Sequence, residues 1–101
     1  MDRKMLNQLQ QMQKKMMQAQ EELGTTNVEG SAGGGIVTVT MNGHREVQAV
    51  KISPDAVDPD DVELLQDLVM AAIADASKKA QEIAEAKMGP LTGGVNIPGL
   101  F

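Results

Sequence analysis

The chain has 101 residues, a net charge of −5, no cysteine and a single aromatic residue, Phe101. This length suits one domain, and the lack of cysteine excludes a disulfide framework, a cysteine zinc site and a thiol nucleophile. A small core built from Met, Leu, Ile, Val and Ala is thin for a monomer, so we expect self-association. No apolar run suits a secretory signal or the roughly 20 residues of a membrane helix, so we expect a cytoplasmic protein.

The first element is a predicted helix over residues 2–23. Asp2 is a suitable N-cap, and neither Pro nor Gly interrupts the segment before Gly24, a residue that commonly follows a helix. Apolar residues recur at spacings of four, three, four, three and four, which is typical of a helix packed along a partner helix. This seam consists of Met5, Leu9, Met12, Met16, Ala19 and Leu23.

The middle of the chain, residues 25–53, is predicted to form a three-stranded antiparallel meander. The first strand opens this segment and leads into a glycine-rich turn. The second strand is predicted at 36–41, a stretch rich in β-branched residues. Asn42-Gly43 is a strong signal for a tight hairpin, and the third strand follows at 46–52.

A second long helix is predicted over residues 59–88. Asp58 suits the N-cap and Pro59 the first helical position, and the neighbouring carboxylates favour the positive end of the helix dipole. Met88-Gly89-Pro90 ends the helix.

The predicted order of elements is helix, three-stranded antiparallel sheet, helix, which is an α+β arrangement. Residues 1–88 are therefore expected to form one domain. Residues 89–101, rich in Gly and Pro, are expected to form a flexible C-terminal tail.

Short motifs along the chain follow one another in an order seen in a known family. They begin with a first helix rich in Gln and Met and end with an acidic segment that runs into the apolar stretch 64–72. The motifs between them lie at 28–35, 37–39, 42–43, 50–52 and Pro54. Taken together, this set resembles the YbaB/EbfC family of bacterial nucleoid-associated proteins over essentially the whole chain.

This resemblance implies a homodimer in which the sheets meet centrally and the helices project like tweezers. It also implies a protein without catalytic activity that binds double-stranded DNA, associates with the nucleoid and influences gene expression. Neither the residues nor the resemblance indicates a cofactor, a small-molecule substrate or a membrane.

Acidic and basic residues are segregated along the sequence. Seven acidic residues and no basic residue lie between Ser53 and Ala76, whereas basic residues gather in the first helix and late in the second. If the two helices are antiparallel, most of the basic residues converge on the distal half of the molecule, where they can contact phosphates. The predicted DNA contacts are Arg3, Lys4, Gln11, Lys14, Lys15, Gln18, Lys78, Lys79 and Lys87.

No catalytic or metal site can be assembled from the sequence. His44 is the only histidine and lies in a predicted turn without an evident partner, and the methionines are explained by adaptable packing. We therefore expect neither an enzyme nor a metal protein. The alternative to DNA binding is a protein–protein interaction scaffold or a chaperone-like clamp, which the acidic total favours.

Overall fold

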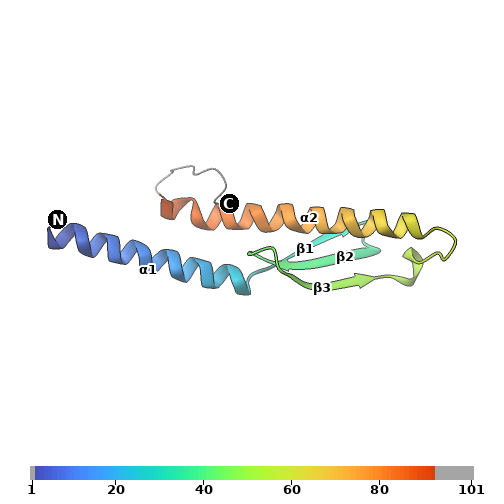
Figure 1. Ribbon diagram of the computed structural model, residues 1–101, viewed down its shortest axis with the longest axis horizontal. Helices are drawn as coiled ribbons and strands as arrows, with labels where there is room; N and C mark the ends of the chain where they lie inside the picture. Colours follow the sequence, from blue (N-terminus) through green and yellow to red (C-terminus); the bar gives the residue numbers. More distant parts are fainter. Residues whose placement is uncertain (1, 93–101) are drawn as a thin grey trace.

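The computed structural model describes residues 2–92, and its order of elements confirms the predicted α+β arrangement (Figure 1). The helices and strands are α1 (Arg3–Thr25), β1 (Asn27–Ala32), β2 (Val37–Asn42), β3 (Val47–Ile52) and α2 (Val62–Met88). Two short 3-10 turns, η1 (Pro54–Ala56) and η2 (Pro90–Thr92), precede and follow α2. No helix in this part of the chain is both long and apolar enough to cross a membrane.

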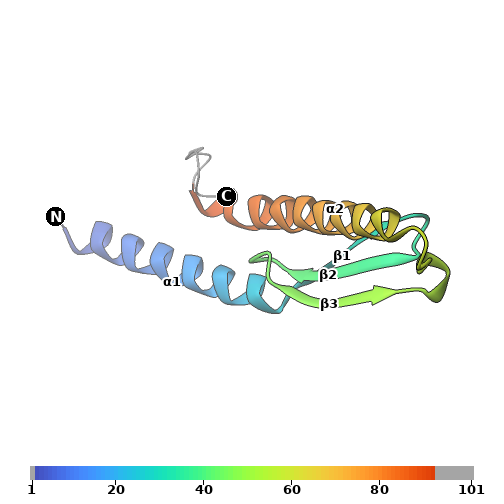
Figure 2. The ribbon, with the colours of Figure 1, turned by 45° about the vertical axis from the view of Figure 1, so that its right-hand side comes forward.

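The three strands form one antiparallel sheet in the order β1-β2-β3. Helix α2 runs back over the sheet and packs on β1 and β2, whereas α1 extends away from the sheet and past the end of α2 (Figures 1 and 2). All six residues of β3 are exposed. The sheet therefore has one covered part, under α2, and one open edge strand.

The main core lies between β2 and α2. Val37, Val39 and Met41 alternate along β2 toward the helix, as expected for a strand with one covered face, and they meet Ala72 and Ala76 on α2. The small side chains of α2 allow its backbone to approach the sheet closely, and Gly30 of β1 faces the helix backbone at this point. A second, smaller cluster joins the end of α1 to the end of α2 through Ala19, Leu23 and Met88.

Helix α2 begins three residues later than the sequence predicted. Its N-cap is Asp61, whose carboxylate accepts a hydrogen bond from the amide of Leu64 at 3.3 Å, and not Asp58. The carboxylate of Asp58 accepts from the amide of Asp60 at 3.0 Å and so forms a separate turn before the helix. Both aspartates are good caps, and the turn that leads in from η1 selects the second one.

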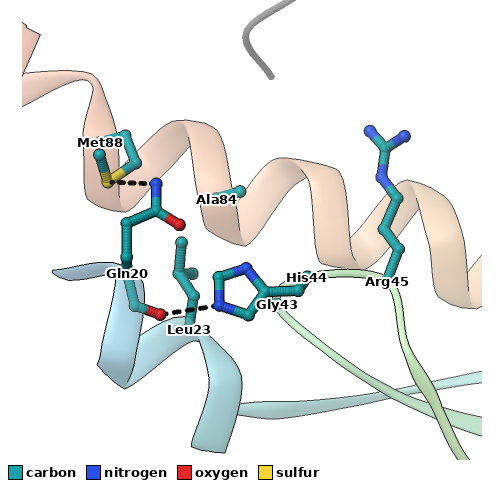
Figure 3. A pocket seen from close by; sticks show the side chains of 7 residues that line it. All are labelled: Gln20, Leu23, Gly43, His44, Arg45, Ala84 and Met88. Carbon is teal, nitrogen blue, oxygen red and sulfur yellow. Dashed lines mark hydrogen bonds between the residues drawn. The ribbon is translucent and has the colours of Figure 1, made fainter. Parts of the chain in front are cut away.

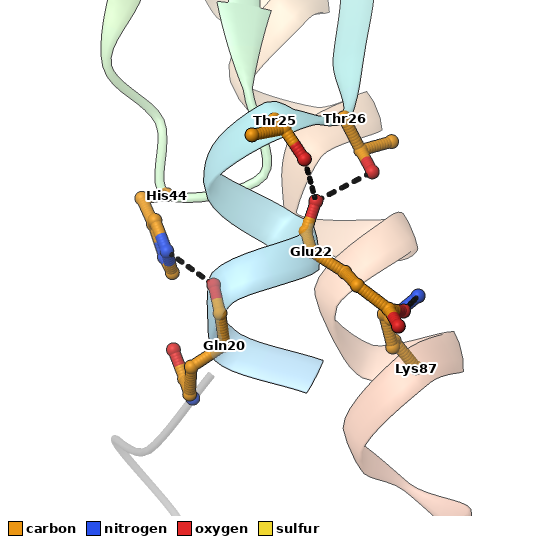
Figure 4. A network of polar contacts seen from close by, with 6 residues as sticks. All are labelled: Gln20, Glu22, Thr25, Thr26, His44 and Lys87. Carbon is orange, nitrogen blue, oxygen red and sulfur yellow. Dashed lines mark hydrogen bonds and ion pairs between the residues drawn. The ribbon is translucent and has the colours of Figure 1, made fainter. Parts of the chain in front are cut away.

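Helix α1 also continues past its predicted end. Gly24 and Thr25 are helical, and Thr26 is the C-cap. The hydroxyls of Thr25 and Thr26 both donate to the carbonyl of Glu22, at 3.2 and 2.7 Å (Figure 4). These bonds, together with contacts from the β2–β3 turn described below, satisfy carbonyl groups that a helix end leaves without partners.

The β2–β3 connection forms a hairpin at Asn42-Gly43, as predicted, with its bounds one residue later than the predicted strands gave. Strand β2 ends at Asn42, strand β3 begins at Val47, and the register shifts between Thr40 and Met41. The amide of Asn42 donates to the carbonyl of Glu46 at 3.0 Å, so four residues form the loop.

The predicted tail begins with an ordered turn. Leu91 in η2 packs against the cluster of Ala19, Leu23 and Met88. Residues 93–101 of the predicted tail lie outside the described residues.

Much apolar surface stays exposed in the single chain. On α1 the first half of the seam is open, with exposed fractions of 54% for Met5, 44% for Leu9 and 48% for Met12. On β3 the exposed fractions of Val50 and Ile52 are 47% and 42%. Large apolar side chains exposed together on one helix face or along one strand are typical of an interaction site.

Candidate nucleic-acid interface

The basic residues of α1 lie on one exposed face of that helix. Arg3, Lys4, Lys14 and Lys15 are all exposed, and none of them forms an ion pair within residues 2–92. Gln11 and Gln18 follow Lys4 at intervals of seven residues and are exposed as well. At about 100° per residue, these six residues fall within an arc of about 120°, centred roughly opposite the apolar seam. We call them the basic arc of α1.

The face that carries the basic arc changes sign near the sheet. Glu21 and Glu22 continue it toward the end of α1, and both are exposed. Lys87 of α2 forms an ion pair with Glu22 (Figure 4). This pair links the two helices and partly neutralises Lys87. Lys87 therefore lies at the root of α1, the end that joins the sheet, and away from its tip, the free N-terminal end.

The remaining two predicted contacts lie on α2 beside the sheet. Lys79 forms an ion pair with Asp75 at 3.3 Å and donates a hydrogen bond to the carbonyl of Glu29 in β1 at 3.0 Å. Lys78 is exposed. The basic residues of the two helices therefore do not converge on one distal end as expected: the basic arc lies toward the free end of α1, whereas the three lysines of α2 lie at the root of α1 or beside the sheet.

Asp75 explains why Lys79 is held over the strand. Its carboxylate accepts a hydrogen bond from the amide of Ser31 at 3.0 Å. This backbone hydrogen bond, followed by the hydrogen bond from Lys79, lowers the pKa of Asp75 below its usual value. The carboxylate stays ionised and ties α2 to β1, so the Lys79 charge has a structural partner.

The acidic segment lies at the other end of the molecule. Helix α2 starts at the end of the sheet opposite to α1 (Figures 1 and 2). The acidic residues at this end are Asp55, Asp58, Asp60, Asp61, Glu63 and Asp67. The single chain is therefore polarised along its length, with the free end of α1 basic and the start of α2 acidic.

The β2–β3 turn supports the root of α1, a role that the sequence did not predict. The backbone amide of Gly43 donates to the carbonyl of Leu23 at 2.8 Å. The side-chain amide of Asn42 donates to the carbonyl of Gly24 at 3.2 Å. The Nε2 atom of His44 lies 2.8 Å from the carbonyl oxygen of Gln20 (Figure 3). These contacts hold the last turns of α1 against the sheet, and His44 has a backbone partner that its place in a turn did not reveal.

Within residues 2–92, no group of three or more His, Cys, Asp or Glu side chains is placed to hold a metal ion.

The comparison with protein families decides the identity. A family described as the YbaB/EbfC DNA-binding family matches residues 1–95. The chain belongs to this family. The resemblance seen in the ordered motifs is thereby confirmed.

Relatives in the family are bacterial and carry a functional name. A nucleoid-associated protein from Roseiflexus sp. (strain RS-1) is 67% identical over 89 residues, which cover 88% of each chain. A nucleoid-associated protein from Chloroflexus aurantiacus is 62% identical over 98% of this chain and 97% of its own. A crystal structure of an uncharacterized protein from Helicobacter pylori matches with a TM-score of 0.77 at 29% identity, over 92% of this chain and 99% of its own.

Proposed function

We propose that the protein is a homodimeric component of the bacterial nucleoid that grips duplex DNA with its two α1 helices and thereby influences gene expression. The observation that carries this proposal is the basic arc of α1. It is exposed, without ion pairs in the described chain, opposite the apolar seam and remote from the acidic start of α2. Such a surface neutralises phosphates without regard to base sequence.

The electrostatics of α1 also explain how an acidic protein approaches DNA. Counterions are released where cationic side chains meet phosphates, so local charge matters more than the total. Six acidic residues lie at the start of α2, at the end of the sheet opposite to α1 (Figure 1).

The dimer is supported by the apolar surface that the single chain leaves open. An apolar groove of about 510 Å³ between β3 and α2 is lined by Ile52, Leu65, Val69 and Met70, with Gln66 at its side. Next to it, β3 is an edge strand with free backbone groups. A second copy of the chain would cover this surface and bring the two sheets together.

We expect sedimentation velocity at micromolar concentration to give about twice the chain mass of 10.8 kDa. The double variant Ile52→Glu/Met70→Glu should shift the protein toward monomer, because it places two charges on the apolar groove. Gln10→Glu adds a charge to an exposed position of α1, outside this surface, and serves as the control. A monomeric wild-type protein would contradict the dimer.

DNA binding is tested by its salt dependence. If the four cationic residues of the basic arc contact phosphates in both protomers, the slope of log K against log salt should be about −7, from roughly −0.9 for each of eight contacts. Fluorescence anisotropy of a labelled duplex at four salt concentrations measures this slope. A flat response would count against backbone recognition, and no binding at low salt would favour the interaction scaffold.

A further inference from the structure

The β2–β3 turn holds an arginine in an unfavourable backbone conformation. Arg45 has φ of 62°, and it is the only residue other than glycine with positive φ in the part of the chain that the structure describes. This left-handed region crowds the Cβ of every residue except glycine. Conformations of this kind persist where surrounding contacts enforce them, and they cluster at functional sites.

Asn42 supplies the contacts that enforce this conformation. Its side chain is 3% exposed, and its Oδ1 accepts hydrogen bonds from the amides of His44 and Glu46 at 2.9 and 3.0 Å. Its Nδ2 donates to the carboxylate of Glu46 at 2.7 Å and to the carbonyl of Gly24. The amide of Arg45 donates to the carbonyl of Asn42 at 3.0 Å. The turn is thus a rigid support, fastened to the end of α1.

The side chain carried by this support has no partner in the described chain. The guanidinium of Arg45 forms neither a hydrogen bond nor an ion pair within residues 2–92. Arg45 is one of the residues that line a cleft of about 240 Å³ between the ends of α1 and α2, and its guanidinium extends over α2, away from the side chains of Gln20 and His44 (Figure 3). The carboxylate of Glu46, the next residue along the chain, accepts a hydrogen bond from Asn42, and neither ion pair of the described chain includes Arg45.

We propose that Arg45 binds a DNA phosphate at the root of α1, as a second backbone contact distinct from the basic arc. This inference rests on the proposed function. A planar guanidinium matches phosphate oxygens in a two-pronged geometry, and a rigid turn lowers the entropy lost when the contact forms. From Lys15 to the end of α1 is about 15 Å along the helix, so Arg45 reaches a different phosphate from those at the tip.

The test uses the unfavourable backbone conformation of Arg45. Replacing a residue with only a structural role changes stability, whereas replacing a residue that binds DNA also changes the affinity for the duplex. Arg45→Gly removes the crowding and should raise the thermal midpoint of unfolding, while it lowers the affinity for duplex DNA by roughly eightfold per contact at 0.1 M salt. The slope of log K against log salt should become less steep by about 1.8 in a dimer, about 0.9 for each lost contact. Arg45→Gln keeps the crowding and loses the charge, so it should lose the same affinity without gaining stability.

Lys51→Gln is the matched control, because it removes one positive charge from exposed strand β3 and leaves the turn unchanged. If both Arg45 variants bind as Lys51→Gln does, with an equal slope, the inference is wrong and the proposed function stands. If the wild-type protein binds no duplex, both the inference about Arg45 and the proposed function are wrong. Lower affinity and a shallower slope for the two Arg45 variants, relative to Lys51→Gln, establish the contact.

Discussion

Gly30→Ala is expected to lower the free energy of unfolding by about 3–5 kcal/mol, a large part of the stability of a small domain. A Cβ at position 30 would lie 2.2 Å from the amide nitrogen of Ala76 and 2.5 Å from the carbonyl oxygen of Ala72. Both atoms belong to the backbone of α2, so no side-chain rotation can relieve the overlap. Helix α2 would have to move off β1, and the core between α2 and β2 would open with it.

Urea unfolding followed by circular dichroism measures this loss. Gly24→Ala is the control. Gly24 lies within α1, and a Cβ there would lie 3.4 Å from the ring of His44, which is an ordinary van der Waals contact. It should stabilise the protein by about 0.5–1 kcal/mol through helix propensity. Equal midpoints for Gly30→Ala and the wild type would show that α2 does not approach β1 as closely as described.

Lys14→Glu/Lys15→Glu is expected to weaken binding to duplex DNA by at least about 100-fold at 0.1 M salt. Both lysines are exposed and without ion pairs in the described chain, so their charge is available to phosphates. In a dimer the change removes four favourable contacts and adds four carboxylates to the same surface. Anisotropy titration at two salt concentrations gives both the affinity and the change of slope.

A second pair of adjacent lysines provides the matched control. Lys78→Glu/Lys79→Glu makes the same change of charge on α2, but Lys79 is already paired with Asp75 beside the sheet. This variant should lose much less affinity than the variant in α1. If the two variants lose affinity equally, the duplex lies along α2 as well, and the grip does not belong to α1 alone.

Local patterns in the sequence were enough to predict the order of elements, the three antiparallel strands and the family. The β-branched run that became β2 and the seam on α1 are periodic signals, and periodicity depends only on neighbours a few residues apart. The basic arc of α1 is of the same kind, since residues on one helix keep their mutual angles whatever the rest of the chain does.

The pairing of charges required the tertiary structure. Lys87 and Glu22 are 65 residues apart in the sequence, and Lys79 meets a carbonyl group 50 residues away. No short-range signal distinguishes these lysines from Lys14 and Lys15. The choice of Asp61 over Asp58 as the cap of α2 similarly followed from the path of the chain after η1.

The sequence by itself thus determined the elements, their order and the charged face of α1, because each of these depends on contacts along one segment. Only the tertiary structure decided which cations remain free to bind a ligand. It also showed that the β2–β3 turn supports α1 and holds Arg45 in a left-handed conformation. These features arise from contacts between segments far apart in the chain, where hydrogen bonds and ion pairs depend on distance in space.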